Sequence, residues 1–378
     1  MRSWRRLAAI ARKEWIQIRR DARSLSIVVA MPILLMLMFG YGVSLDTKHI
    51  PVCVFDRDRT PASRDLLSRF RASQYFDVTD AVDNYPALVR AIDSGRVRLA
   101  IVVPNDFSRL VEQGGPVAVQ AIVDATDDNT ASLAISYSEA VVRGYSIRAQ
   151  IDWSERRGLA PAPAPLRVEP RVWYNENLES SVFIVPGVIA IVMAVIGTFL
   201  TSLTIAREWE RGTMEQLLST PVKPIEILLG KLAPYFAIGM ADTALCAGLA
   251  VGWFGVPFRG SWAALFLASA LFLLVVLLMG YFLSVVAKSQ LAASQLALIS
   301  TFMPAFLLSG FLYPIGQMPA ALRAIARVIP ARYYVALVKA LFLKGSPVAW
   351  LERDLLALGI FAVVLAAASI RAFRKKLT

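Results

Sequence analysis

The stretch REWERGTMEQLLSTP, residues 207–221, places five charged residues between two long apolar segments. Residues 182–206 before it contain no charged residue, and residues 232–258 after it contain one, Asp242. An α-helix needs about 20 apolar residues to cross the ~30 Å hydrocarbon core of a membrane. Both flanking segments are long enough to span a membrane, and the charged stretch between them predicts a short helix outside it.

Apolar segments of this kind recur along the chain, which has 378 residues and is 57% hydrophobic. Uncharged runs cover residues 24–45, 182–206, 260–287, 289–322 and 355–370, and residues 232–258 add a sixth run interrupted only by Asp242. The last run is short and has to extend over 349–351 to cross. The first run is too long for the apolar part of a cleaved signal peptide and follows a basic helix. We therefore predict six transmembrane helices.

The net charge of +12 is concentrated beside the first and last spans. Residues 1–23 carry eight Arg and Lys against two acidic residues, and residues 371–378 carry four basic and no acidic residues. Because basic residues beside membrane spans collect on the cytoplasmic side, both ends are predicted to be cytoplasmic. The charge thus indicates contact with the lipid bilayer and its anionic headgroups rather than with nucleic acid.

Residues 4–20 within the segment 1–23 are predicted to form an amphipathic helix. One stripe is apolar, with residues spaced three or four apart, namely Trp4, Leu7, Ala8, Ala11, Trp15 and Ile18. Basic side chains, among them Arg12 and Lys13, repeat every seven residues on another face. This pattern is typical of a helix that lies in the cytoplasmic interface of a membrane. The alternative is a plain extension of the first span.

The only sizeable polar region is residues 46–180, with 16 basic and 19 acidic residues. Strand patterns at 52–55, 75–78, 98–104 and 117–124 alternate with helix patterns at 61–72, 84–94, 105–111 and 128–153. This alternation predicts an α/β domain inserted between spans one and two, outside the cytoplasm. The Ala-Pro run at 160–165 predicts a stiff connector, followed by an extended return at 167–175.

No catalytic machinery is visible in the sequence. The nucleotide-binding pattern G-x-x-x-x-G-K-[ST] is absent, and the single histidine, His49, has no companion for a metal site or a catalytic triad. Cys53 and Cys246 are not expected to meet, because only Cys246 lies within a span. We predict no catalytic residue, no metal and no cofactor in this chain, so a partner has to supply the energy for any transport.

The predicted helix at 207–221 has an apolar stripe of Met214, Leu217, Leu218 and Pro221, and Gly212 separates it from span two. Two spans after a cytoplasmic N-terminus, it faces the cytoplasm. Helices that lie on lipid headgroups are normally basic, and this one has two Arg against three Glu. The pattern favours a helix that binds a groove in another protein, and a helix lying on the membrane is the alternative.

The string R-E-W-E-R-G-T-M-E-Q-L-L-S-T-P-V (207–222) closely resembles the signature of the type-2 ABC exporter permeases, in the branch linked to bacterial drug efflux. Further strings resemble that family, namely RLAIVVPNDFSRLVEQG (98–114), RVWYNENLESSVFIVPGVIA (171–190), ILLGKLAPYF (227–236), FGVPFRGS (254–261) and SGFLYPI (309–315). Together they extend over nearly the whole chain.

The resemblance implies a six-helix permease of the bacterial inner membrane. It would pair with a second permease copy or a paralogue and bind two ABC ATPase subunits, which hold the ATP and Mg. The helix at 4–20 would be the connecting helix, and residues 316–347 an external re-entrant segment, which accounts for the basic residues placed outside by this topology. The domain at 46–180 would be periplasmic and would dock a periplasmic adaptor protein.

The same resemblance makes 207–221 the coupling helix that contacts the ATPase. Its residues in that role are Arg207, Glu208, Trp209, Glu210, Arg211, Gly212, Thr213, Glu215, Gln216, Leu217, Leu218 and Pro221. The expected cargo is a drug or small amphiphile.

Three residues are candidates for the transport pathway. Asp242 lies near the middle of span three, where a carboxylate costs at least ~2.5–3.5 kcal/mol; it is either a pathway contact or a buried hydrogen-bonding group. Pro304 and Gly310 interrupt span five and predict a kink, which is either a gate or an ordinary feature of a packed helix.

Two other classes of membrane protein are compatible with this composition. A membrane-anchored ligand sensor or scaffold would need no ATPase, but the coupling signature and the lack of a cytoplasmic output domain disfavour it. A secondary transporter predicts inverted repeats and paired broken helices, and the sequence has neither.

Overall fold

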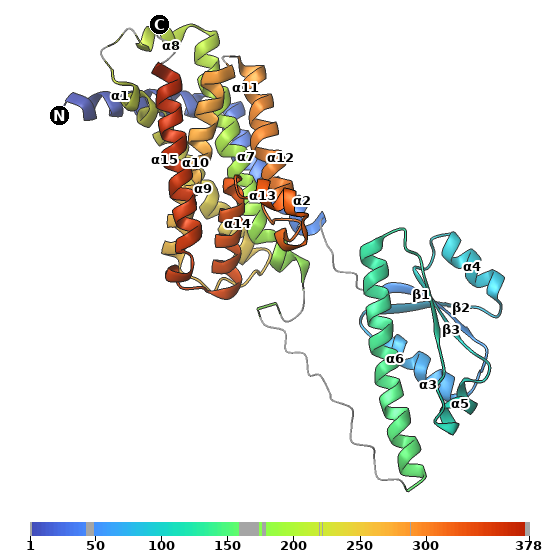
Figure 1. Ribbon diagram of the computed structural model, residues 1–378. Helices are drawn as coiled ribbons and strands as arrows, with labels where there is room; N and C mark the ends of the chain where they lie inside the picture. Colours follow the sequence, from blue (N-terminus) through green and yellow to red (C-terminus); the bar gives the residue numbers. More distant parts are fainter. Residues whose placement is uncertain are drawn as a thin grey trace. The chain divides into compact units, whose positions relative to one another are not determined.

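The computed structural model describes residues 2–42, 49–158, 174–175, 179–218, 220, 222–287 and 289–374. The chain divides into a helical unit, Met1–Ser44 with Val172–Thr378, and an α/β unit, Leu45–Arg171 (Figure 1). The predicted connector at 160–165 and most of the return at 167–175 lie outside the described residues.

Within the described part of the helical unit, five helices are long and apolar enough to cross a membrane. They are α7 (Ser180–Glu210), α9 (Pro224–Gly252), α10 (Trp262–Ala287), the composite Gln290–Leu308 and α15 (Glu352–Arg374). The predicted first span corresponds to α2 (Ala22–Gly42), in which the apolar stretch Val28–Gly42 is shorter.

Helix α7 is the centre of this unit. Of its most apolar window 83% is buried, against 22% for Gln290–Leu308 and 17% for α15. It packs against α2, α9, α10 and α11 (Gln290–Ala297). The approach of α10 is close, because a Cβ atom on Gly280 would lie 2.5 Å from the carbonyl oxygen of Thr198. Small residues at such crossings are typical of packed membrane helices.

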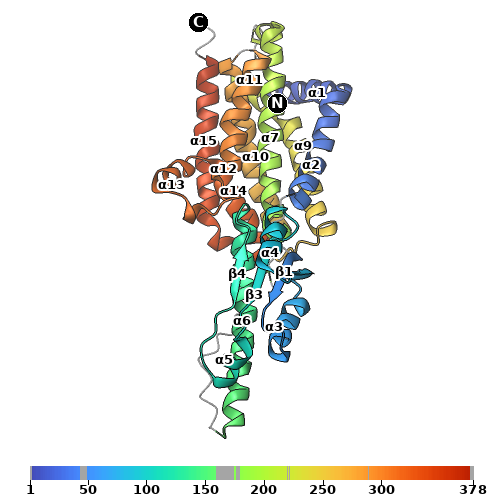
Figure 2. The same ribbon diagram turned by 90° about the vertical axis from the view of Figure 1, so that its right-hand side faces the viewer.

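Helix α1 (Arg2–Arg20) lies across one end of the long helices, at the end where α15 finishes (Figure 2). The short helix α8 (Thr213–Leu218) joins α7 to α9 at that same end. The described residues of the two segments that the sequence singled out, 4–20 and 207–218, are therefore gathered at one end of the unit.

The predicted fifth run, 289–322, is divided in the structure. Helix α11 widens into a π-helical turn, η1 (Leu298–Phe302), before α12 (Met303–Leu308), and the helix ends ahead of Gly310, which has a φ of 82°. Pro304 follows the wide turn, as expected for a residue that lacks an N–H and clashes with the preceding turn.

The segment after Gly310 folds back into the helical unit. It forms η2 (Ile315–Gln317), α13 (Ala320–Ala326), α14 (Pro330–Lys339), η3 (Ala340–Lys344) and η4 (Val348–Trp350). Tyr334 of α14 is fully buried, with its ring stacked on Phe272 at 4.4 Å and its hydroxyl 2.7 Å from that of Ser269. The sixth span does not extend over 349–351 as predicted. It begins at Glu352 and gains its length at the other end, up to Arg374.

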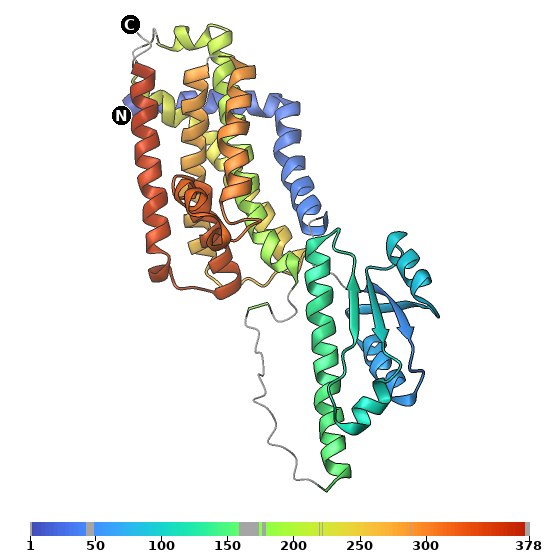
Figure 3. The same cartoon turned by 45° about the vertical axis from the view of Figure 1, so that its right-hand side comes forward.

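The α/β unit holds a four-stranded sheet in the order β2-β1-β3-β4. Helices lie alongside this sheet (Figure 3). The strands are β1 (Ile50–Asp56), β2 (Phe76–Ala81), β3 (Leu99–Val103) and β4 (Gln120–Val123), and only β4 runs antiparallel to its neighbour. The helices are α3 (Pro61–Ala72), α4 (Tyr85–Asp93), α5 (Phe107–Gln113) and α6 (Asp128–Arg156).

Successive side chains of the central strands lie on opposite faces of this sheet. Val52 and Ile101 belong to a core shared with α3, α5 and α6, whereas Cys53 and Ala100 belong to a smaller core shared with α4. This is the period of two expected of a sheet with helices on both faces.

Candidate functional site

The predicted coupling segment is divided between two helices. Residues 207–210 continue α7 without a break, and the chain turns at Gly212, whose φ of 70° is readily adopted by glycine. Only Thr213–Leu218 form the separate helix α8. Met214 is fully buried, whereas Thr213 and Gln216 are exposed. Pro221 and the side chains of Glu215, Leu217 and Leu218 lie outside the described residues.

Four charged side chains from three helices form an ionic hub beside this turn, namely Lys13 and Glu14 of α1, Glu208 of α7 and Lys231 of α9. The Lys231 ammonium donates to Glu14 Oε1 at 3.0 Å and to Glu208 Oε2, and the Lys13 ammonium lies 2.7 Å from Glu208 Oε1. The side chains of Lys231 and Glu14 are each 1% exposed. Buried charges of this kind are tolerated only when they are paired.

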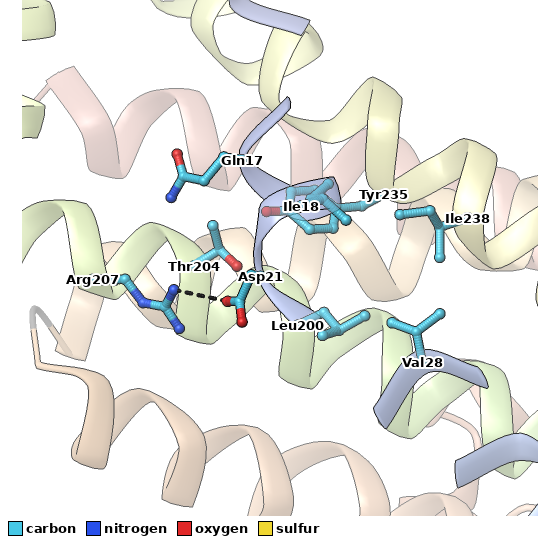
Figure 4. A pocket seen from close by; sticks show the side chains of 9 residues that line it. All are labelled: Gln17, Ile18, Asp21, Val28, Leu200, Thr204, Arg207, Tyr235 and Ile238. Carbon is cyan, nitrogen blue, oxygen red and sulfur yellow. Dashed lines mark hydrogen bonds and ion pairs between the residues drawn. The ribbon is translucent and has the colours of Figure 1, made fainter. Parts of the chain in front are cut away.

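Two more residues of the signature link α7 to other helices. Arg207 Nη1 donates to Asp21, between α1 and α2, at 3.2 Å (Figure 4). Arg207 Nε donates to the Gln290 side chain at 3.3 Å. Glu210 accepts hydrogen bonds from the backbone N–H and the side-chain amide of Gln290, at the start of α11. The last turn of α7 is thereby bonded to α1, α9 and α11.

The described residues of the signature 207–222 therefore fall into two groups. Arg207, Glu208 and Glu210 bond to other helices of the same chain. Helix α8 follows directly, between the ends of α7 and α9. A displacement of α8 would reach α7 and α9 through the backbone and α1 and α11 through these side chains.

Helix α1 presents two different faces. Ile10, Glu14 and Ile18 are buried against the rest of the unit, whereas Trp4 is 73% and Trp15 42% exposed. Arg12 is exposed, as predicted for a basic face. Lys13 is exposed as well, and its ammonium also bonds to Glu208. Partial burial lowers the pKa of the Lys13 ammonium. The hydrogen bond to Glu208 and the charge of that carboxylate outweigh this effect, so the pKa of Lys13 lies above its ordinary value.

Comparison with known proteins identifies the family. A family model described as "ABC-2 family transporter protein" matches residues 23–371. The chain belongs to the ABC-2 transporter family.

Its relatives carry permease names. The chain is 41% identical to the "Probable multidrug ABC transporter permease YbhS" of Escherichia coli, over 91% of this chain and 90% of that protein. It is 27% identical to the "Probable multidrug ABC transporter permease YbhR" of the same organism, over 98% and 99% of the two chains. These relatives and the apolar helices identify the chain as a multi-pass membrane subunit of an ABC transporter.

The three pathway candidates of this ABC-2 chain are not gathered into one site. Asp242 is 5% exposed, and its Oδ2 atom has no hydrogen-bond partner among the described residues. Pro304 lines an apolar groove of about 640 Å³ between α12 and α13, which Asp242 does not line. Gly310 ends the broken span, and its carbonyl accepts from the Lys339 ammonium at 2.9 Å.

The sequence analysis did not predict four residues that bond to the end of α7 or to the ionic hub, namely Glu14, Asp21, Lys231 and Gln290. Two of them leave a signal in the sequence. Glu14 is an acid placed three and four residues from apolar positions of the α1 stripe, and Lys231 immediately precedes the apolar run 232–258. In the described ranges, no group of three or more His, Cys, Asp and Glu side chains could hold a metal ion.

Proposed function

We propose that this chain is the permease subunit of an ATP-driven exporter. It acts as a dimer with a second copy or a paralogue, and ATP and Mg²⁺ are bound by partner ABC ATPase subunits. The chain crosses the bacterial inner membrane six times with both ends in the cytoplasm, and the α/β unit lies in the periplasm, where an adaptor protein can dock. Small amphiphilic molecules are the cargo, in keeping with the word "multidrug" in the names of the relatives.

The observation that carries this proposal is the connection of α8 to the rest of the helical unit. A six-residue helix is too short to be stable alone, and the buried Met214 anchors it to the core of the helical unit. The α7 turn beside it is bonded to three other helices through Glu208, Glu210 and Arg207. ATP-driven closure of the ATPases would displace α8, and these bonds would pass the displacement to α1, α9 and α11.

The path of α2 supports a sixth crossing. Asp21, just before α2, pairs with Arg207 near the end of α7, and Tyr41 at the other end of α2 accepts a hydrogen bond of 2.9 Å from Trp253, just past α9. Since α9 is itself long enough to span a membrane, α2 runs alongside a membrane-spanning helix over much of its length.

Co-purification with the cognate ABC ATPase tests the proposal. The variant Glu215→Lys/Leu217→Asp changes α8. The matched control Glu155→Lys/Ile151→Asp likewise replaces a glutamate by lysine and an aliphatic residue by aspartate, on exposed positions of α6. We expect the wild type and the α6 variant to retain the ATPase and the α8 variant to lose it. Failure of the wild type to retain any ATPase would contradict the proposal.

A second pair of changes separates binding from coupling. Glu208→Gln/Lys231→Met removes two charges of the ionic hub but leaves α8 intact. We expect this variant to bind the ATPase and to lose most efflux of ethidium, an amphiphilic dye, from cells. If the variant transports ethidium at the wild-type rate, the hub does not transmit motion.

A ligand sensor is the second candidate function, because the α/β unit has a groove of about 520 Å³, a volume typical of small-molecule sites. Phe107, Tyr145 and Trp153 line it. A chain that binds no ATPase but binds a small molecule through this groove would favour the sensor.

A further inference from the structure

A basic depression of about 680 Å³ lies between α1 and the last turn of α7. Four positive side chains line it, with one negative side chain among them; they are Lys13, Arg20, Arg207, Arg211 and Asp21. The lining therefore has an excess of three positive charges. The volume is in the range of ligand sites in proteins.

Two of the four cations are already engaged by the protein. Lys13 bonds to Glu208, and Arg207 pairs with Asp21. Arg20 and Arg211 are exposed, and neither makes an ion pair within 4.0 Å with the described residues, although the charge of Arg211 helps to lower the pKa of the neighbouring Glu210 carboxyl. Two guanidinium groups are thus left to bind an anion, and guanidinium matches the geometry of phosphate oxygens.

Apolar surface adjoins the depression. The pocket of Figure 4 shares Gln17, Asp21 and Arg207 with it and continues to Ile18, Val28 and Leu200. That pocket holds only about 20 Å³, so an acyl chain cannot enter it.

An acyl chain has room beside α2 instead. Helix α2 starts next to Asp21, and along it Val29 is 48%, Leu34 52% and Met38 59% exposed. A ligand with a phosphate head and long apolar chains matches both surfaces.

We propose that the basic depression binds the phosphate of an anionic phospholipid, with its acyl chains along the exposed face of α2. Basic pockets between helices near a membrane surface recognise such headgroups. The exposed apolar side chains of α2 face the bilayer in the proposed topology, and a phospholipid can place its phosphate in the depression while its chains lie beside them; for this reason we infer a lipid rather than an acidic protein surface. The proposal requires only that the chain is a membrane protein and does not depend on ATPase coupling.

Native mass spectrometry of the full chain in detergent tests the site. The probes are dioleoyl-phosphatidylglycerol, zwitterionic dioleoyl-phosphatidylcholine and soluble glycerol 3-phosphate. Arg20→Gln/Arg211→Gln removes the two cations of the depression that form no ion pair within 4.0 Å with the described residues. Arg12→Gln/Arg19→Gln removes the same charge from exposed positions of α1 outside the depression and is the control.

We expect the wild type to prefer phosphatidylglycerol and the first variant to bind it roughly thirty-fold more weakly, since each basic side chain near a membrane surface contributes about fivefold. The control variant should stay within about twofold of the wild type. Size-exclusion chromatography checks that each variant is folded.

Four results would overturn the proposal. The wild type could lack a preference for phosphatidylglycerol over phosphatidylcholine, or the two variants could lose the lipid equally. Glycerol 3-phosphate could compete as well as the lipid, which would indicate a site for a soluble anion. Loss of the ATPase from Arg20→Gln/Arg211→Gln with unchanged lipid binding would assign the depression to the ATPase.

Discussion

At the scale of single residues, Lys231 is the side chain on which the ionic hub depends. It is 1% exposed and bonds to both Glu14 and Glu208. Replacing it in Lys231→Met would leave two buried carboxylates with less compensation, and breaking a buried pair in this way costs about 3–5 kcal/mol. We expect a large fall in the midpoint of thermal unfolding of the detergent-solubilised chain, which intrinsic fluorescence measures.

A double variant controls for the loss of packing. Glu208→Gln/Lys231→Met removes one carboxylate along with the ammonium, so it should be more stable than Lys231→Met alone, although it carries one change more. Equal or lower stability of the double variant would mean that the hub is held by packing rather than by charge.

Asp124 offers a test by pH in the α/β unit. Hydrogen bonds from Thr126 and the nearby Arg98 guanidinium hold the pKa of this carboxyl below its usual range. A lowered pKa stabilises the fold above the unfolded value of about 3.9, and this contribution is lost as the pH falls through the folded value.

We therefore expect the α/β unit of Asp124→Asn to lose less stability than that of the wild type as the pH falls from about 5 to about 2. Limited proteolysis of the full chain at each pH measures this loss. Asp77→Asn, on an exposed residue with no ion pair among the described residues, is the control. An unchanged acid response in Asp124→Asn would contradict the assignment.

At the scale of elements, the sequence was most informative where one local signal decided the outcome. The helix predicted at 61–72 has the bounds of α3, because Thr60 caps it and Pro61 opens it. The strand predicted at 117–124 is shorter, since β4 covers only Gln120–Val123. In this antiparallel register residues 117 and 118 would lie opposite residue 105 and Pro104, beyond the end of β3, so they have no strand to pair with.

The candidate site was predictable only in part. The position of a short helix after span two follows from the charged stretch and Gly212. The ionic hub could not be predicted from the sequence, because Glu14 and Lys231 are 217 positions apart and no periodicity relates them. Only the packing of α1 against α9 brings them together.

The packing of α10 on α7 gives a prediction for an element. A Cβ atom on Gly280 would lie 2.5 Å from the Thr198 carbonyl oxygen, a backbone atom that can move only with its helix. We expect Gly280→Ala to destabilise the chain by about 1–3 kcal/mol through overpacking.

Gly248→Ala, in α9, is the matched control, because a Cβ atom there would meet nothing within 4 Å. It should be neutral or slightly stabilising, as alanine is the better helix former. Equal thermal midpoints for Gly280→Ala and Gly248→Ala would show that the two helices can separate at no cost.

At the scale of the whole molecule, the exposed apolar surface requires a cover. On α15 the exposed side chains Leu356, Ile360, Val363 and Val364 follow the helical period, and they are 57–70% exposed. A stripe of this kind is stable against lipid or a second copy of the chain and unstable in water. The dimeric permease proposed above provides both.

The number of crossings sets the last prediction. If α2 crosses the membrane, α1 and the α/β unit lie on opposite sides, and both ends of the chain lie on one side. Single cysteines at the exposed positions Arg5, Glu112 and Arg371, in a chain with Cys53 and Cys246 replaced, would report this through a membrane-impermeant maleimide. We expect Glu112→Cys to react in cells with a permeabilised outer membrane, and Arg5→Cys and Arg371→Cys only after lysis.

Five crossings would give a different pattern, with Arg5→Cys and Glu112→Cys on the same side and Arg371→Cys on the other. That pattern conflicts with the hub. Arg5 belongs to α1, which bonds to Glu208 at one end of α7, while the chain enters α7 from the α/β unit at Ser180, the other end. A 31-residue helix is about 46 Å long, and α2 is the helix that connects α1 to the α/β unit, so we expect α2 to supply the sixth crossing of the proposed topology.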